Sequence, residues 1–190
     1  MTGQRFSVIV IIILLILIGI SLDRQLFAQT TTLQFKEYKE QYGRFSIQVP
    51  KDWTIQYMHI KQDSVGISFD PNYANVTLIV EAFDRNTTTS EADYEQSIKE
   101  NNADTVAQLP GAKLIQATDC TKYVIDGNKV CSMIYTTTIP YHGIYYTGEE
   151  MDVDFQTDKQ VVSIAFTGDA DIFHKYLPVV EQMLNSMKVS

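Results

Sequence analysis

Residues 42–53, YGRFSIQVPKDW, decide how the folded part of this chain begins. Apolar side chains recur there at every second position, the period of a strand with one buried face, at Phe45, Ile47 and Val49. Pro50 cannot donate to a strand ladder and predicts the end of that strand. Trp53, the single tryptophan of the chain, then brings a large apolar surface to the start of the next strand. Because the stretch supplies no nucleophile or base, we interpret it as a folding device and not as a catalytic loop.

The composition is that of a globular protein and excludes two classes of partner. Of 190 residues, 45% are hydrophobic and 20% charged, and this length suits one domain with its own core. The formal net charge is −8, and no run of basic residues occurs. Binding to nucleic acid or to anionic lipid headgroups requires clustered Lys and Arg, so we expect neither partner.

Residues 6–22 form an uncharged apolar segment, which predicts that the chain is targeted to a membrane. Its length lies between the core of a signal peptide and a minimal spanning helix. Residues 1–28 are therefore either a signal peptide cleaved after Ala28 or a retained N-terminal membrane anchor. Both alternatives predict an exported protein, on the outer face of the cytoplasmic membrane or extracellular. Residues 29–41 are predicted to be a polar tether, and residues 42–190 the folded domain.

The remaining pattern predicts a hairpin-rich sheet with two helices. Strands are expected over 45–49, 53–60, 65–69, 76–83, 113–125, 129–139, 151–156 and 161–166. Ser90 followed by Asp93 predicts the start of the first helix, and Pro110-Gly111 its end. The closing helix carries an apolar stripe over residues 172–187, with Asp169 or Asp171 as its cap. We expect Pro178 to kink or restart it. So few helices over such a sheet indicate an α+β fold.

Three motifs in this order resemble the PsbP-type domain, the fold of an extrinsic photosystem II subunit and of its relatives outside photosynthesis. They are the Phe-x-Ile-x-Val-Pro-x-x-Trp entry of residues 45–53, VTLIVEAF at 76–83, and YLPVVEQMLNSMKV at 176–189. The resemblance covers about residues 35–190. It implies an α/β/α sandwich, with a twisted antiparallel sheet flanked by helices. It also implies a domain that binds or assembles something and does not catalyse a reaction.

Two departures separate the chain from a photosystem subunit. Its N-terminus has a secretory pattern and not that of an Arg- and Ser-rich transit peptide. A short polar tether stands where that subunit has an extended N-terminal region. The resemblance therefore implies the fold and not the photosynthetic role.

The sequence lacks the common motifs of catalytic sites. It holds no Gly-x-Ser-x-Gly, no P-loop and no Gly-x-Gly-x-x-Gly, and its three histidines do not have metal-ligand spacing: His59, His142 and His174. We therefore predict a non-catalytic module without a cofactor, with a protein partner at or near the membrane. The alternative is a secreted enzyme, a hydrolase or a thiol enzyme, with a dispersed active site.

One acidic stretch is a candidate calcium site. Residues 147–154, TGEEMDVD, hold four carboxylates, and calcium accepts oxygen ligands in loose geometry: Glu149, Glu150, Asp152 and Asp154. The alternative is the solvated face of a strand, because the ligand ladder of a calcium-binding hand is missing.

Cys120 and Cys131 are the only cysteines, and an exported protein reaches an oxidising compartment, so we predict a disulfide between them. The intervening DGN turn sets its geometry. A two-residue turn at Asp126-Gly127 places both cysteines on one face, diagonally offset, so that a bulge must bring them together. A three-residue turn would place them on opposite faces and disfavour the bond.

Two further kinds of surface site are predicted. Asn75 and Asn86 match the acceptor pattern for N-linked sugars. The cluster YHGIYY, residues 141–146, follows Pro140 and is expected in a loop or strand bend. Its aromatic rings with polar tips suit a partner contact, for which the candidates are Tyr141, His142, Tyr145 and Tyr146. The alternative is that these rings cover the sheet edge as core.

Overall fold

The computed structural model describes residues 33–190 except 62, 86–88, 110 and 142–143, and the side chains of residues 139–146 are also left undescribed. The compact unit is Phe35–Ser190. The expected signal peptide or anchor, residues 1–28, lies outside the described residues. Within the described part, none of the helices is long and apolar enough to span a membrane.

Two antiparallel sheets and two helices make up this unit. The small sheet has the order β1-β2-β10, from Phe35–Lys39, Phe45–Pro50 and Lys188–Val189. The large sheet has the order β3-β4-β5-β9-β8-β7-β6. Its strands are β3 Trp53–Ile60, β4 Ser64–Pro71, β5 Val76–Asp84, β6 Lys113–Ile125, β7 Asn128–Tyr141, β8 Ile144–Gln156 and β9 Gln160–Asp169. The helices are α2, Glu91–Gln108, and α3, Ala170–Ser186.

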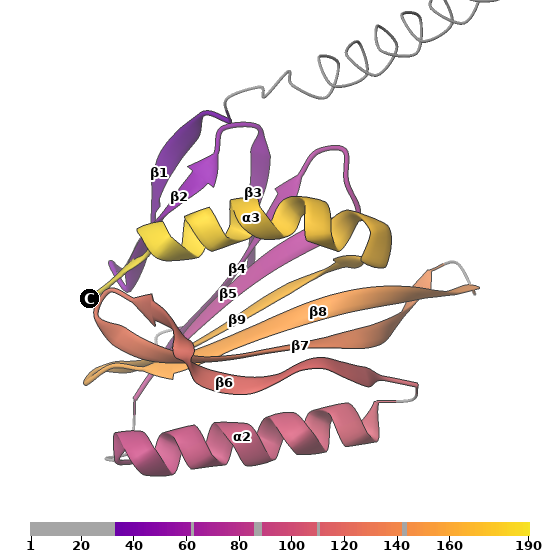
Figure 1. The fold of residues 1–190 in the computed structure, drawn as a ribbon. Helices are drawn as coiled ribbons and strands as arrows, with labels where there is room; N and C mark the ends of the chain where they lie inside the picture. The colour runs from indigo at the N-terminus through magenta and orange to yellow at the C-terminus, as the bar shows by residue number, and fades with distance from the viewer. Residues whose placement is uncertain (1–32, 62, 86–88, 110, 142–143) are drawn as a thin grey trace, which may run out of the picture. The chain divides into compact units, whose positions relative to one another are not determined.

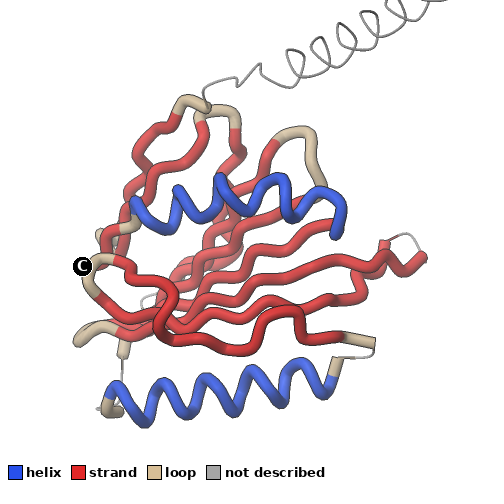
Figure 2. The backbone as a smooth tube through the Cα atoms, in the orientation of Figure 1, coloured by secondary structure: helices blue, strands red, loops and turns tan. Residues whose placement is uncertain are grey.

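The helices lie on opposite faces of the large sheet (Figure 1). Helix α3 and the small sheet cover one face, and α2 runs along β6, β7 and β8 on the other. Figure 2 shows the same layers by element type. The fold is therefore an α+β, α/β/α sandwich with a twisted antiparallel sheet, as predicted.

The apolar core lies between the large sheet and α3, and side chains of residues 42–53 form part of it. Phe45, Ile47 and Val49 of β2 are at most 2% exposed, and β2 ends at Pro50. Trp53 is 3% exposed, and its ring lies 6.1 Å from that of Tyr176 on α3. The interpretation of residues 42–53 as a folding device is thus confirmed.

The second face of the sheet is covered less tightly. Helix α2 begins at the predicted cap, where the Asp93 amide donates to Ser90 Oγ. Of its eighteen residues, all of them described, Asn102 alone is buried. The side chains turned toward the sheet are otherwise half-buried, at i, i+4 spacing: Tyr94, Ile98, Val106 and Leu109.

Three expectations about elements were wrong. Phe35–Lys39, expected within the polar tether of residues 29–41, forms β1, because it pairs with β2 in register from Phe35 opposite Pro50. Helix α3 runs as one element through Pro178, so the expected restart does not occur. That proline is exposed, so water can satisfy the carbonyl that lacks a donor, while four buried side chains hold the helix on the sheet.

The third concerns residues 141–146, which were expected in a loop or bend. The strands instead extend to the tip of the β7–β8 hairpin, where Pro140 pairs with Tyr145 and Tyr141 with Ile144. Antiparallel pairing over the whole length of the hairpin carries the backbone past Pro140.

Candidate functional site: a charged groove where three turns meet

A groove of about 730 Å³ lies at one end of the large sheet. The turns β6–β7 and β8–β9, the start of α2 and the last residues of the chain form its walls. An adjoining depression of about 370 Å³ adds the β1–β2 turn and shares Lys159 and Ser190 with the first. These segments are distant in sequence, and the fold alone brings them together.

The walls of the larger groove carry both signs of charge. Its cations are Arg85, Lys129 and Lys159, and its carboxylates are Glu91, Glu95, Asp126, Asp154 and Asp158. Lys129 lies 3.3 Å from Glu91, and Lys188 lies 3.0 Å from Asp126. Backbone donation from Val189 and then the nearby ammonium of Lys188 lower the pKa of Asp126. Ion pairs of this exposed kind are weak and exchangeable, which suits a polar binding surface.

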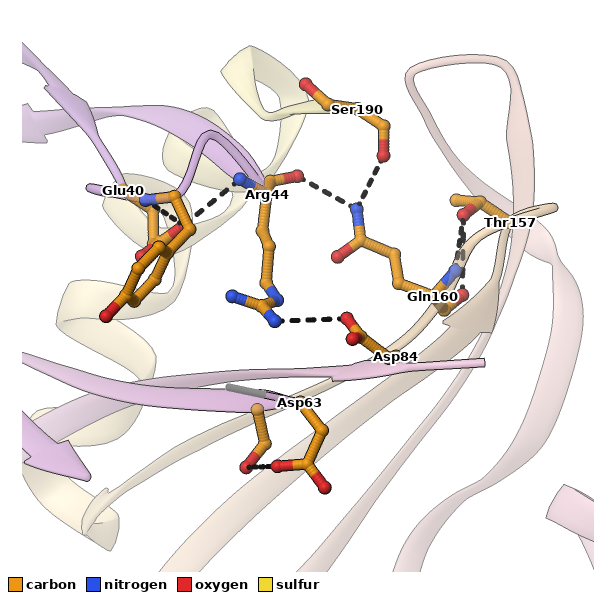
Figure 3. Close-up of polar contacts among 9 residues, drawn as sticks. Glu40, Arg44, Asp63, Asp84, Thr157, Gln160 and Ser190 are labelled. Atoms are coloured by element: carbon orange, nitrogen blue, oxygen red, sulfur yellow. Dashed lines mark hydrogen bonds and ion pairs between the residues drawn. The ribbon is translucent and has the colours of Figure 1, made fainter. Parts of the chain in front are cut away.

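Gln160 joins the β1–β2 turn, the β8–β9 turn and the last residue of the chain (Figure 3). Its side chain is 3% exposed, and its Nε2 donates to the backbone carbonyls of Arg44 and Ser190 at 2.9 and 3.0 Å. Its own backbone is held by Thr157 at the β8–β9 turn. One side chain therefore fixes the start of β2, the turn before β9 and the end of β10.

An ion pair and a buried carboxylate complete this corner. The side chain of Arg44 is 11% exposed and lies 3.0 Å from Asp84 Oδ1. Glu40 is 3% exposed and accepts from the amides of Tyr42 and Arg44 through Oε2. Figure 3 shows both carboxylates on either side of Arg44. The arrangement orders the β1–β2 turn at the groove wall.

The predicted disulfide is confirmed. Cys120 and Cys131 are bonded, and the turn is the two-residue form, with Ile125 opposite Asn128 and positive φ at Asp126 and Gly127. The ladder slips between the Asp119 and Tyr123 pairs, and this irregularity brings the cysteines together as expected. Both are buried, so neither offers a thiolate for the alternative of thiol chemistry.

The calcium candidates do not converge. Glu149 faces α3, where His174 Nε2 lies 3.0 Å from its Oε2. Glu150, Asp152 and Asp154 lie on the opposite face, opposite β7 residues that α2 covers. Among the described residues no group of three or more His, Cys, Asp or Glu side chains could hold a metal ion. Calcium binding thus gains no support from this geometry.

Burial alters the titration of two of these carboxyls. It raises the pKa of Asp152 to about 8, with the charges of Glu150 and Asp154 acting in the same direction. It also raises the pKa of Asp154, which a hydrogen bond from Ser163 partly offsets. Tyr94 lines the groove beside Asp154, and burial raises the pKa of its hydroxyl. Its oxygen has no hydrogen-bond partner among the described residues, so no proton-transfer pair with Asp154 is formed.

The other predicted surface sites are placed in part. Asn75 is exposed in the β4–β5 turn, whereas Asn86 lies outside the described residues. Tyr141, Tyr145 and Tyr146 lie in strands β7 and β8, but their side chains are not described, and His142 lies outside the described residues. Glycosylation and the aromatic partner contact therefore remain predictions.

Sequence reasoning missed Gln160, Arg44 and Lys159. The turn signal TDKQ at residues 157–160 marks where β8 ends, but nothing local to it shows which other turns lie beside it. A glutamine that begins an apolar strand was the available signal, because a buried amide there needs partners.

No family model and no curated protein matches the sequence. The domain is similar to the solution structure of cyanobacterial PsbP from Synechocystis, with TM-score 0.56 and 12% identity over 86% of this chain and 96% of that one. It is also similar to the Ran-binding protein Mog1p of Saccharomyces cerevisiae, with TM-score 0.52 and 10% identity over 83% and 96%. A Bacteroides thetaiotaomicron protein matches at TM-score 0.49 and 18% identity, and 83% of this chain spans about half, 49%, of that one. At these identities the likeness establishes a shared fold.

Proposed function

From its PsbP-like fold over residues 35–190 as a premise, we propose that this chain is a non-catalytic protein-binding or assembly module that is exported and held near a membrane. The observation that carries the proposal is the groove. It is a depression of about 730 Å³ with charged walls, and a depression of that size accommodates a polar segment of a partner.

The chemistry of the groove supports binding and not catalysis. Its titratable groups come from separate turns and pair with one another, as Lys129 does with Glu91. Within the described residues, the groove lining includes no serine, cysteine or histidine hydrogen-bonded to a base, which nucleophilic catalysis requires. Two of the solved structures with TM-scores above 0.5 are a PsbP and a Ran-binding protein, and both descriptions are compatible with a binding role.

Two features support export. The uncharged segment of residues 6–22 fits a signal peptide or anchor. The disulfide between Cys120 and Cys131 joins the two cysteines of the chain, and such bonds persist in oxidising compartments. With a retained anchor, the domain stays near the membrane; with a cleaved one, it is secreted.

Affinity capture of the full-length protein from native membranes tests the proposal. Lys159 lies in the wall of both depressions and is exposed, so Lys159→Glu should change the amount of captured partner at least about tenfold, since reversing a charge within an interface alters its electrostatic complementarity. Lys113→Glu is the matched control, because Lys113 is exposed at the other end of β6.

Equal capture by both variants would remove the groove as the binding surface. Capture of no partner by the wild type, together with turnover of a small-molecule substrate that Lys159→Glu abolishes, would establish the alternative of a secreted enzyme.

A further inference from the structure

Three carboxylates of β8 form a row beneath α2, which we term the acid ladder: Glu150, Asp152 and Asp154. They alternate along the strand with Met151, Val153 and Phe155, which are at most 1% exposed in the core on the other face. Because those neighbours are buried in the core, strand alternation places the three carboxylates of the acid ladder on the face that α2 covers. Its last member, Asp154, also lines the groove.

The strands on both sides bring no charge to the acid ladder. On β7 the directly opposed residues are Tyr135, Met133 and Cys131, and on β9 they are Thr167, Ala165 and Ser163. The nearest polar groups on these strands are the hydroxyls of Tyr135 and Ser163, and the charges of Asp152 and Glu150, together with burial, raise the pKa of Tyr135. One strand further, the same face carries Glu81, which lies opposite Ser163 and 3.8 Å from His59.

Helix α2, which packs against this face, brings no neutralising cation either. Its side chains at the groove end are Glu91, Tyr94 and Glu95, and the charge of Asp154 acts on the Tyr94 hydroxyl. The one lysine of α2, Lys99, is exposed, and its charge contributes to lowering the pKa of Asp119 on β6. No ion pair to the acid ladder occurs among the residues that the structure describes.

A proton is therefore the available means of reducing the charge of the acid ladder. Glu150 and Asp152 are two residues apart on one face of β8, so the charge of either carboxyl disfavours the charge of the other. Both are half-buried beneath a covering helix, where ionising both would place two adjacent negative charges in incomplete contact with water.

Helix α2, which covers the acid ladder, packs weakly against the sheet. A single residue of α2, Asn102, is buried, and its amide donates to Thr118 Oγ1 of β6 at 3.3 Å. A helix with so narrow an apolar contact has little packing energy to oppose the hydration of ionised carboxylates.

We infer that the acid ladder is a proton-operated hold on α2. While Asp152 carries a proton, α2 stays packed on β6, β7 and β8. When Asp152 loses that proton, hydration of the charged ladder favours displacement of α2, and the groove loses the wall that Glu91, Tyr94 and Glu95 supply. The effect on a partner rests on the proposed function of the groove, whereas the movement of α2 does not.

Hydrogen exchange of the full-length protein in detergent, without a partner, tests the movement. After correction for the intrinsic pH dependence of exchange, the amides of residues 91–108 should exchange at least about tenfold faster near pH 9.5 than near pH 6.5. The amides of β9 should keep their protection. Asp152→Asn, which keeps the size and stays neutral, should abolish the acceleration.

Asp104→Asn is the matched control, because Asp104 lies on the exposed side of α2. It removes the same charge and should leave the acceleration unchanged. An α2 whose protection does not depend on pH, or an equal acceleration in wild type and Asp152→Asn, would overturn the inference. If Asp152→Asn does not fold, carboxyl NMR of the wild type decides, and titration of Asp152 below about pH 6 would refute the hold.

Capture at the two pH values then separates the two proposals. Loss of the partner near pH 9.5 from wild type but not from Asp152→Asn supports both. Accelerated α2 exchange in a protein that captures no partner at either pH would leave the hold on α2 intact and remove the proposed function.

Discussion

At the groove end, single side chains join segments that no strand pairing or helix connects. Gln160 is the clearest of them, since its amide donates to the carbonyls of Arg44 and Ser190 from a site that is 3% exposed. Losing a buried donor leaves its acceptors unsatisfied, and that costs more than the net contribution of the bond.

Gln160→Ala should therefore lower the free energy of unfolding by about 1–3 kcal/mol. The measurement is the urea midpoint of the full-length protein in detergent. Gln108→Ala, at the exposed end of α2, is the control and should change stability by less than about 0.5 kcal/mol. Equal midpoints for both variants would mean that water replaces the Gln160 amide.

Ser132 gives a prediction of the opposite sign. It is fully buried in β7 opposite Val153, and its Oγ has no hydrogen-bond partner among the described residues. Ser132→Ala removes an unsatisfied hydroxyl and should leave the urea midpoint unchanged or raise stability by up to about 1 kcal/mol. Ser68→Ala should instead lower the urea midpoint, because Ser68 Oγ donates to Asp70. A loss above about 1 kcal/mol in Ser132→Ala would reveal a partner for that hydroxyl.

At the scale of elements, the β6–β7 hairpin combines a two-residue turn with a bulge and a disulfide. The turn fixes the register at Ile125 opposite Asn128, and the slip before Tyr123 then places Cys120 beside Cys131. Register and bulge together are what make the cross-strand bond possible.

Replacing both cysteines with alanine should cost about 3 kcal/mol, the loop-closure value for a sequence separation of 11 residues. The urea midpoint of the variant under oxidising conditions should match that of the wild type under reducing conditions. An oxidised wild type no more stable than the variant would show that the bond adds no net constraint to the unfolded chain.

At the scale of the whole molecule, the raised pKa of Asp152 couples stability to pH. Its folded-state pKa is about 8 against an ordinary value of 3.8, so between these values the folded protein binds a proton that the unfolded chain lacks. The free energy of unfolding therefore falls as pH rises through this window, with a slope of at most about 1.4 kcal/mol per pH unit. The raised pKa of Asp154 acts in the same direction.

The difference in unfolding free energy between Asp152→Asn and wild type should accordingly grow in favour of the variant from about pH 4 to about pH 8 and then level off. Urea titrations at a series of pH values measure it, with Asp104→Asn as the charge control. A difference that does not vary with pH would place the carboxyl of Asp152 in water.

The sequence by itself determined the features whose cause is local. The alternation ending at Pro50, the burial of Trp53 and the Ser90 cap of α2 follow from backbone chemistry and periodicity. The order of these elements was enough for the α/β/α sandwich. The two cysteines of an exported chain were enough to predict the disulfide, and the structure decided the turn length that allows it.

Only the tertiary structure decided what depends on pairing between distant segments. Phe35–Lys39 lacks a strand alternation and becomes β1 because β2 lies beside it. The acid ladder reads as a solvated strand face, and burial, together with the charges of Glu150 and Asp154, raises the pKa of Asp152 only once the chain has folded. The groove end forms where Gln160 holds the β1–β2 turn, the β8–β9 turn and the last residue of the chain together. Local sequence carries propensity, whereas burial and the distance between charges exist only once the chain has packed.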